Sequence, residues 1–253
     1  MVETPAYRDF LYPLNVFMHI LIAEEGRVDY LHYGLFAGAD ESIATAQERS
    51  TELLLARLPP PPSRLLDVGA GVGTTLARLT ALGYDVVGIT PDAHQVALVQ
   101  SRYGDSVRVV CERFEDHDEA SDVILFQESS QYIDSGALFL RAAALSRHVI
   151  VLDEFSQRPL DMPGALHSLE EFLAAASANG FHLSENLDLS AQAAPTIDYF
   201  MKRIPRYRER LQADLALTGE QVEELLTSGA RYREFYRDGT YAYRLLQFRR
   251  GGE

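Results

Sequence analysis

The stretch that decides the fold is Arg64-Leu-Leu-Asp-Val-Gly-Ala-Gly-Val-Gly-Thr-Thr75. Residues 65–68 are apolar apart from Asp67, a pattern typical of a short buried strand. Glycines follow at positions 69, 71 and 73, and an amphipathic helix is predicted from Thr74 to Leu82. A strand, a glycine turn and a helix together bring backbone N–H groups and a helix N-terminus close to a nucleotide-like ligand. The stretch therefore predicts an α/β protein with such a site, and a tight turn without a ligand is the alternative.

The composition is that of a globular protein rather than a disordered or fibrous one. The chain has 253 residues, of which 47% are hydrophobic and 24% charged, enough for one large α/β domain with a cap. A net charge of −14 argues against nucleic acid as the main partner. The single cysteine, Cys111, excludes an intramolecular disulfide, and we expect a buried structural thiol because it closes an apolar run.

An apolar stretch near the start of the chain, residues 10–23, is too short to span a bilayer. Two acidic residues, Glu3 and Asp9, precede it, unlike the basic start of a signal peptide. We therefore expect a cytoplasmic protein that does not insert into membranes. The sequence leaves a homodimer open.

Short apolar segments alternate with helical ones after the linker Pro59–Pro62, and this alternation predicts a parallel sheet covered on both faces. The expected strands are 65–68, 85–89, 107–111, 123–126, 148–152, 181–189 and, antiparallel, 240–248. The expected helices are 10–22, 42–58, 74–82, 92–103, 135–145, 168–179, 196–217 and 219–237. The predicted fold is a Rossmann-like, seven-stranded, mostly parallel sheet with an antiparallel last strand, a helical N-terminal lid and a helical insertion before that strand. The expected domains are a lid (1–62), a ligand-binding core (63–194), a helical cap (195–238) and the final core strand (239–253).

The spacing of the glycine turn, Asp-x-Gly-x-Gly-x-Gly, resembles motif I of the class I S-adenosylmethionine-dependent methyltransferases. In that family the loop holds the methionine part of the cofactor. The resemblance implies that Asp67, Gly69, Ala70, Gly71 and Gly73 bind S-adenosylmethionine, with S-adenosylhomocysteine as the product. Asp67 at the strand end is suited to fix the loop by accepting backbone N–H bonds.

The second strand ends in Thr90, where the common pattern has an acidic residue for the ribose hydroxyls. The segment Gly88-Ile-Thr-Pro-Asp-Ala-His-Gln95 is similar to one in cyclopropane-fatty-acid-synthase-like methyltransferases, where the Thr and the Gln contact the cofactor. This resemblance implies cofactor contacts for Thr90 and Gln95. The alternative for Thr90 is a helix cap, with Pro91 in the first turn.

The third strand is followed by Cys111-Glu-Arg-Phe-Glu-Asp116. Families of this type read the adenine amino group here with an acid beside an apolar residue. Arg113 stands at the position of the acid, so Glu112, Glu115 or a backbone carbonyl is left for that role. Phe114 is the expected adenine-packing residue, and Arg113 and Phe114 are both expected at the cofactor.

The fourth strand ends in Leu125-Phe-Gln-Glu-Ser-Ser-Gln-Tyr-Ile133, and polar residues at this point of a parallel sheet face the ligand crevice. The segment looks like the Glu-x-x-Glu-His motif of the same family, with Glu128 matching and Gln131-Tyr132 replacing the final pair. Glu128 and Tyr132 are therefore candidate catalytic residues, and Gln127 a cofactor contact. The alternative for Glu128 is an exposed loop carboxylate.

The segment Val28–Phe36 resembles the one that folds over the cofactor in small-molecule members of the family. Its His32 and Tyr33 are candidates for proton transfer, and Tyr33 also for cofactor contact. The alternative is an aromatic cluster that docks two helices. His167, beyond the fifth strand, is a further candidate base.

The resemblance covers about residues 28–253 and points to the cyclopropane-synthase-like and tocopherol- or ubiquinone-type C-methyltransferase group. It implies methyl transfer from S-adenosylmethionine to a small, hydrophobic or aromatic acceptor. The missing histidine after Gln131 keeps open a methyltransferase-fold enzyme with different chemistry, such as cyclisation or cyclopropane formation. A non-enzymatic ligand-binding module is the third hypothesis. No metal is expected. The side chains expected to line the acceptor pocket are Tyr132, His167, Tyr199, Phe200, Tyr232 and Tyr236.

Overall fold

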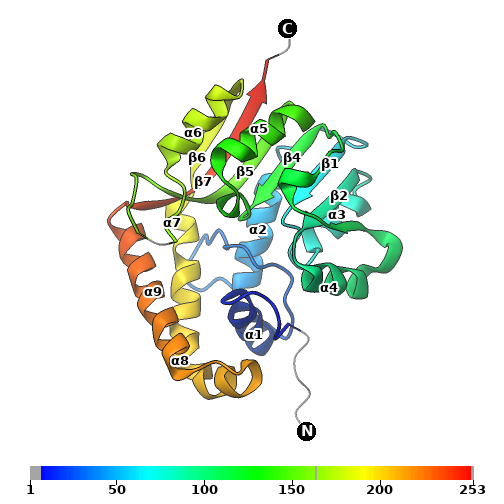
Figure 1. Ribbon diagram of the computed structural model, residues 1–253. Coiled ribbons are helices and arrows are strands. Elements are labelled where there is room, and N and C mark those ends of the chain that lie inside the picture. The colour runs from blue at the N-terminus through cyan, green and yellow to red at the C-terminus, as the bar shows by residue number, and fades with distance from the viewer. Residues whose placement is uncertain (1–6, 163, 252–253) are drawn as a thin grey trace. The chain divides into compact units, whose positions relative to one another are not determined.

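A computed structural model describes residues 7–162 and 164–251 of the chain (Figure 1). The chain divides into two compact units. One comprises the residues up to 50 together with 191–238, and the other comprises residues 51–190 together with 239–253. The boundary falls inside helix α2, and each unit is described by itself below.

The second unit is built on a seven-stranded sheet with the order β3-β2-β1-β4-β5-β7-β6. Strands β1 to β5 pair in parallel, and β7 runs antiparallel to both β5 and β6. This confirms the predicted Rossmann-like, mostly parallel sheet with an antiparallel last strand. The strands are β1 (Arg64–Val68), β2 (Asp85–Thr90), β3 (Arg108–Cys111), β4 (Val123–Gln127), β5 (His148–Ser156), β6 (Phe181–Asp188) and β7 (Tyr241–Arg250).

The helices begin and end at residues with the expected capping chemistry. Gly26 ends the first helix in the left-handed conformation, and Ser168 caps the sixth by accepting a hydrogen bond from Glu171 N. The α-helices are α1 (Leu14–Glu25), α2 (Ile43–Leu55), α3 (Thr74–Ala81), α4 (Ala93–Tyr103), α5 (Ser135–Leu145), α6 (Leu169–Ala178), α7 (Ser190–Ala193), α8 (Pro195–Leu215) and α9 (Gly219–Arg237). Three 3₁₀ turns complete the described elements: η1 (Gly104–Ser106), η2 (Phe114–Asp116) and η3 (Ser130–Tyr132).

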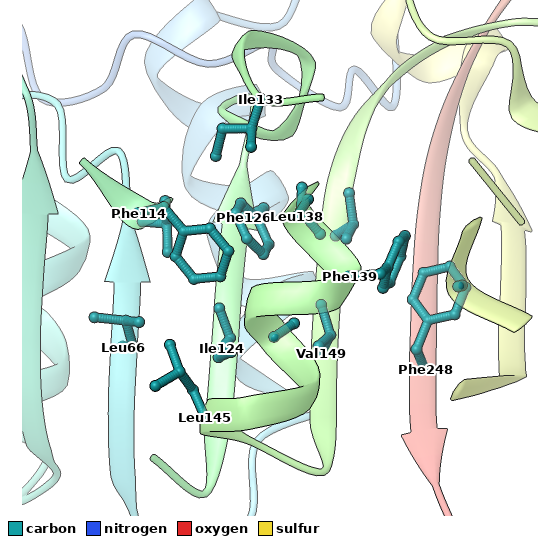
Figure 2. Packing of buried hydrophobic residues seen from close by; sticks show 14 of the residues in the cluster. Leu66, Phe114, Ile124, Phe126, Ile133, Leu138, Phe139, Leu145, Val149 and Phe248 are labelled. Carbon is teal, nitrogen blue, oxygen red and sulfur yellow. The ribbon is translucent and has the colours of Figure 1, made fainter. Parts of the chain in front are cut away.

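One face of the sheet packs against α5 and α6 in an apolar core (Figure 2). Ile124 and Phe126 of β4, Val149 of β5 and Phe248 of β7 lie in this core. Phe139 of α5 packs edge-on against the ring of Phe248, with 5.1 Å between the centroids. Because side chains alternate along a strand, the residues between these ones face the other side of the sheet.

The opposite face of the sheet carries α2 and α3. A Cβ added at Gly88 of β2 would lie 2.7 Å from Leu76 of α3, so only glycine allows this approach. The Gln127 amide at the end of β4 contacts Thr51 of α2 and Thr75 of α3. Polar side chains thus enter this face at its carboxyl edge, where a ligand of an open parallel sheet binds.

The other unit packs α1, α8 and α9 together. Glu24 of α1 accepts hydrogen bonds from Arg203 and Tyr207 of α8, at 2.9 and 2.7 Å. A Cβ added at Gly229 of α9 would lie 1.9 Å from the sulfur of Met201, so these two helices cross closely because position 229 has no side chain. Within the described residues, no helix has the length and apolar character needed to cross a membrane.

Three local predictions were wrong. Helix α1 begins at Leu14 rather than Phe10, because Pro13 cannot donate a backbone hydrogen bond within the helix. Helix α2 ends at Leu55, three residues before the predicted end, and turns join it to the prolines. Cys111 is exposed rather than buried, because β3 is an edge strand of the sheet.

Candidate functional site

The glycine turn after β1 lies at the carboxyl edge of the sheet, with positive φ angles of 79°, 54° and 82° at Gly69, Gly71 and Gly73. The N–H groups of Gly69 and Ala70 both donate to the carbonyl oxygen of Ile89, at 2.8 and 3.2 Å. The backbone of β2 therefore fixes the turn. The prediction that the Asp67 carboxylate does so by accepting N–H bonds was wrong, since those donors already have a partner.

The three glycines differ in what surrounds them. A Cβ at Gly69 would lie 2.5 Å from Cβ of Ser129, and one at Gly73 would lie 2.8 Å from Val99. A Cβ at Gly71 would meet only the carbonyl oxygen of Gly69, at 3.8 Å. Among the residues that the structure describes, the N–H groups of Gly71 and Val72 make no hydrogen bond. The turn is thus packed on two sides and open at Gly71, with two N–H donors there.

Asp67 is buried beneath this turn, with 3% of its surface exposed. Its Oδ2 atom has no hydrogen-bond partner among the described residues. Burial raises the pKa of Asp67 to about 7. A buried carboxylate oxygen without a partner is costly, so it marks a place where a cationic or hydrogen-bonding ligand group would be stabilised. The open turn and this carboxylate fit the amino-acid end of a nucleoside cofactor.

Thr90 and Gln95, predicted together, are in contact. The Thr90 hydroxyl donates to Gln95 Oε1 at 3.0 Å and accepts from the N–H of Asp92 at 3.3 Å. The cap of α4 is Asp92, which accepts from His94 N at 2.8 Å. The alternative interpretation of Thr90 as the helix cap with Pro91 in the first turn was therefore wrong: Pro91 precedes the cap.

The loop after β3 places its predicted residues in two environments. Arg113 is exposed and pairs with Glu115 at 2.6 Å. Phe114 is buried and packs edge-on against Phe126 of the core, with 5.1 Å between the centroids. Glu112 accepts from or pairs with the imidazole of His117 at 3.0 Å. The N–H of Glu112 also donates to the Thr90 carbonyl oxygen, so this loop lies beside the end of β2. Which residue reads adenine stays a prediction.

Glu128 follows β4 and has a φ of 55°, the left-handed region that residues with a side chain rarely adopt. Its carboxylate accepts a hydrogen bond from the phenol of Tyr243 on β7, with 2.6 Å between the oxygens. Its own N–H donates to the Leu152 carbonyl oxygen. Tyr132, four residues on, is 67% exposed. Strained backbone of this kind concentrates at functional sites, which favours Glu128 as a site residue.

The loop from Glu128 to Ile133 is held by side chains that the sequence did not single out. Ser129 donates to the Val68 carbonyl oxygen at 2.5 Å. The N–H and hydroxyl of Ser130 both donate to Asp153 of β5, at 2.9 and 2.7 Å. Asp153 is fully buried, and burial raises its pKa. A sequence signal existed for it, since Asp153 and Glu154 follow the apolar strand segment 148–152 directly.

His167 also supports this loop. Its Nε2 atom lies 2.9 Å from the carbonyl oxygen of Ile133 and 3.2 Å from that of Ser130. Carbonyl oxygens only accept, so Nε2 carries a hydrogen that it donates to them. This nitrogen is therefore occupied in holding the loop, and only Nδ1 is left as a basic atom in the neutral ring.

His32 and Tyr33 belong to the other unit. The His32 imidazole is buried, and its Nδ1 donates to the Tyr33 carbonyl oxygen at 3.0 Å. Burial lowers the pKa of His32 to about 4, against a smaller opposing effect of that hydrogen bond. The ring of Tyr33 lies 6.5 Å from that of Tyr236. His32 is thus a neutral, packed side chain at physiological pH, whereas Tyr33 is half-buried.

The described residues contain no group of three or more His, Cys, Asp or Glu side chains arranged to hold a metal ion. The donors gathered at the carboxyl edge of the sheet are instead backbone N–H groups, hydroxyls, an amide and carboxylates.

Comparison with known proteins agrees with this arrangement. Residues 66–145 match a family model described as a methyltransferase domain. This segment is therefore similar to a methyltransferase domain. The matched segment runs from β1 to the end of α5, and so includes the glycine turn, Thr90 and Glu128.

One curated relative, from Nitrobacter winogradskyi, is a ubiquinone biosynthesis O-methyltransferase that is 35% identical to this chain over 88 residues. The alignment covers 32% of this chain and 34% of that protein, so the chain spans about a third of its length.

Solved structures resemble the whole fold. The cyclopropane synthase MmaA2 from Mycobacterium tuberculosis superposes with a TM-score of 0.81 at 20% identity, covering 99% of this chain and all of that one. The [4+2]-cyclase SpnF superposes with a TM-score of 0.79 at 18% identity, covering 99% and 98% of the two chains. At such identities the likeness establishes the fold.

Proposed function

We propose that the protein is an enzyme that transfers a methyl group from S-adenosylmethionine to a small acceptor molecule. The observation that carries this proposal is the glycine turn, open at Gly71 and lying over the buried, unpartnered oxygen of Asp67. Gly71 and Val72 would donate N–H bonds to the carboxylate end of the cofactor, and Asp67 would compensate its cationic groups. Thr90, Gln95 and Gln127 border the same edge.

S-adenosylmethionine, when bound, supplies a methyl group on a sulfonium that is displaced in line by a nucleophile. The task of this chain is then to orient the acceptor and to take up its proton. Glu128, held at the end of β4, is our candidate for the proton acceptor. His167 is the weaker candidate, since its Nε2 donates to two carbonyl oxygens.

The acceptor is proposed to be hydrophobic or aromatic, bound by residues 1–62 and 195–238. The unit formed by the first 50 residues and 191–238 contains paired rings that support this proposal. Phe17 and Phe200 lie 4.6 Å apart, and Tyr33 and Tyr236 lie 6.5 Å apart. Such rings provide apolar area together with hydroxyl groups that orient a ligand.

Calorimetry with S-adenosylmethionine and S-adenosylhomocysteine tests the cofactor assignment. We expect Gly71→Val to weaken binding by at least about 100-fold, because the new side chain projects into the open side of the turn. Gly26→Val is the control: Gly26 also has a left-handed backbone, with a φ of 77°, and a Cβ there meets nothing within 4 Å. Binding retained in Gly71→Val, or lost equally in both variants, would contradict the assignment.

A second proposal is a different reaction on the same fold, such as cyclisation. It is favoured by Gln131-Tyr132 replacing an acid–histidine pair and by the engaged Nε2 of His167. Mass spectrometry separates the two: methyl transfer adds about 14 mass units to an acceptor and releases S-adenosylhomocysteine, whereas cyclisation leaves the mass unchanged.

Three further proposals concern the setting of the enzyme: that it acts in the cytoplasm, that nucleic acid is not its substrate, and that it forms a homodimer. Cell fractionation tests the location, a filter-binding assay with duplex DNA tests the absence of nucleic-acid binding, and light scattering of the purified protein tests the homodimer.

A further inference from the structure

The side chain of Tyr243, on the last strand, contacts Glu128, 115 residues earlier in the chain. Its ring is fully buried, with 0% of its surface exposed. A buried phenol needs a hydrogen-bond partner, and here the O–H donates to Glu128 Oε1 at 2.6 Å. Sequence reasoning did not select Tyr243, because nothing along the chain links it to the loop after β4.

The left-handed backbone of Glu128 makes this contact possible. Gln127 points to the face that carries α2 and α3, so regular alternation would turn the next side chain toward the apolar core under α5. Tyr243 lies on the α2–α3 face, since Phe248 and Leu246 of β7 belong to the core on the other face. The positive φ of Glu128 therefore keeps its carboxylate out of the core and on the side of Tyr243.

Both partners are fixed through their main chains. The N–H of Tyr243 donates to the Ser190 hydroxyl at 3.0 Å, and its carbonyl oxygen accepts from Leu189 N at 2.9 Å. The N–H of Glu128 donates to the Leu152 carbonyl oxygen at 2.9 Å. Because the main chains of both residues are held by hydrogen bonds, the Tyr243–Glu128 hydrogen bond restricts the position of the carboxylate more than a flexible loop alone would.

The surroundings of Glu128 are rich in negative charge. Asp153 and Glu154 of β5 lie close enough to the phenol of Tyr132 on η3 to act on it electrostatically, as does Glu128 itself. His167, before α6, is the nearby imidazole and interacts with Asp153. Neighbouring carboxylates disfavour a further negative charge, whereas a donated O–H favours it. Tyr243 supplies that donor from β7.

We propose that Tyr243 is a positioning residue for Glu128, whose phenol hydrogen bond orients the carboxylate and keeps it ionised to receive a proton. The inference rests on the proposed function. In that reaction the nucleophilic atom of the acceptor bonds to the methyl carbon, the C–S pair of electrons stays on sulfur, and the acceptor proton passes to the Glu128 carboxylate. Tyr243 itself keeps its proton throughout.

Carbon-13 NMR of protein labelled at the glutamate carboxyl carbons tests this role without an acceptor. The signal of Glu128 is the one missing from Glu128→Gln. We expect Tyr243→Phe, which keeps the ring, to move the titration midpoint of Glu128 upward by about one pH unit, a tenfold change in its ionisation constant. Affinity for S-adenosylhomocysteine, measured by calorimetry, is expected to stay within about twofold.

Tyr84→Phe is the control, because the Tyr84 hydroxyl donates to the Pro59 carbonyl oxygen at 2.9 Å, at the amino end of β2 and therefore away from Glu128. It should leave the Glu128 midpoint unchanged. An unshifted midpoint in Tyr243→Phe, or an equal shift in Tyr84→Phe, overturns the proposal.

A second measurement needs no variant of the tyrosine. With tyrosine labelled at the carbon that bears the hydroxyl, the Tyr243 signal should titrate with the Glu128 midpoint and cease to do so in Glu128→Gln. A flat Tyr243 signal in the native protein overturns the proposal. Failure of the native protein to bind either S-adenosylmethionine or S-adenosylhomocysteine overturns the proposed function instead. The titrations of Glu128 and Tyr243 need no cofactor, so they still test the hydrogen bond between these residues.

Discussion

Two loops at the carboxyl edge of the sheet reach positive φ angles by opposite means. The turn after β1 places Gly69, Gly71 and Gly73 in the left-handed region, where glycine meets no steric penalty. The loop after β4 places Glu128 there, against the preference of a residue with a side chain. The first loop is shaped by the side chains it lacks. The second is shaped by the contacts of Ser129, Ser130 and Glu128 with three other strands.

The difference separates two kinds of site construction. The glycine turn leaves backbone donors and an unpartnered Asp67 oxygen for a ligand. The β4 loop is instead tied to β1, β5 and β7 by hydrogen bonds, and the one from β7 fixes the Glu128 carboxylate. Binding needs a surface that a cofactor completes, whereas proton transfer needs a group held in one place before the substrate arrives.

The largest expected effect concerns the pH dependence of stability at Asp67. Burial raises the pKa of Asp67 from its ordinary value of 3.8 to about 7, so the folded protein holds a proton that the unfolded chain releases. This contribution is present below pH 4 and is lost as the pH rises through 7. We expect it to reach roughly 4 kcal/mol. Urea unfolding between pH 4 and 8 should show a fall that Asp67→Asn flattens, and an equal slope in both proteins would contradict it.

The direct contact between the two loops gives the next effect. Gly69→Val forces a side chain against Cβ of Ser129 and is expected to lower the free energy of unfolding by about 3 kcal/mol. Gly26→Val has a φ of 77°, close to the 79° of Gly69, but no neighbour within 4 Å, so it should cost about 1 kcal/mol. Equal losses in urea unfolding would mean that the loops can separate.

The hydrogen bonds from Ser130 of the β4 loop to Asp153 are expected to contribute less to the free energy of unfolding. Asp153→Ala leaves the N–H of Ser130 buried without its acceptor, at a cost of about 2 kcal/mol. Asp134→Ala removes a carboxylate that accepts the Ala137 N–H at the exposed start of α5, at a cost of about 1 kcal/mol. A thermal melt of Asp153→Ala no lower than that of Asp134→Ala would show that the loop holds its shape without Asp153.

The smallest expected effect comes from relieving backbone strain at the two described residues that have both a side chain and a positive φ. Ala216, beyond the end of α8, is the other described residue with a side chain and a positive φ, 56°. It is exposed, so Ala216→Gly should raise the free energy of unfolding by about 0.5–1 kcal/mol. Glu128→Gly should gain less, since it also loses the hydrogen bond from Tyr243. A larger gain at position 128 would mean that this hydrogen bond adds nothing to stability.

The order of strands and helices, the antiparallel β7 and the glycine turn could be predicted because they depend on local chemistry. Apolar periodicity, capping residues and glycine spacing act over a few neighbouring residues, and they located the helix ends at Ser168 and Gly26. The exposure of Cys111 could not be predicted, since it depends on which strand lies at the edge of the sheet.

By itself, then, the sequence determined the class of fold, the place of the glycine turn and the candidacy of Glu128. Only the tertiary structure decided that Ile89 fixes that turn, that His167 is engaged by two carbonyl oxygens, and that Tyr243 holds Glu128. The physical reason is one of distance along the chain. A glycine adopts a positive φ without help from distant residues, so its position in the sequence is enough to predict the turn. A left-handed glutamate is stabilised by partners on β5 and β7, and these become its neighbours only when the sheet forms.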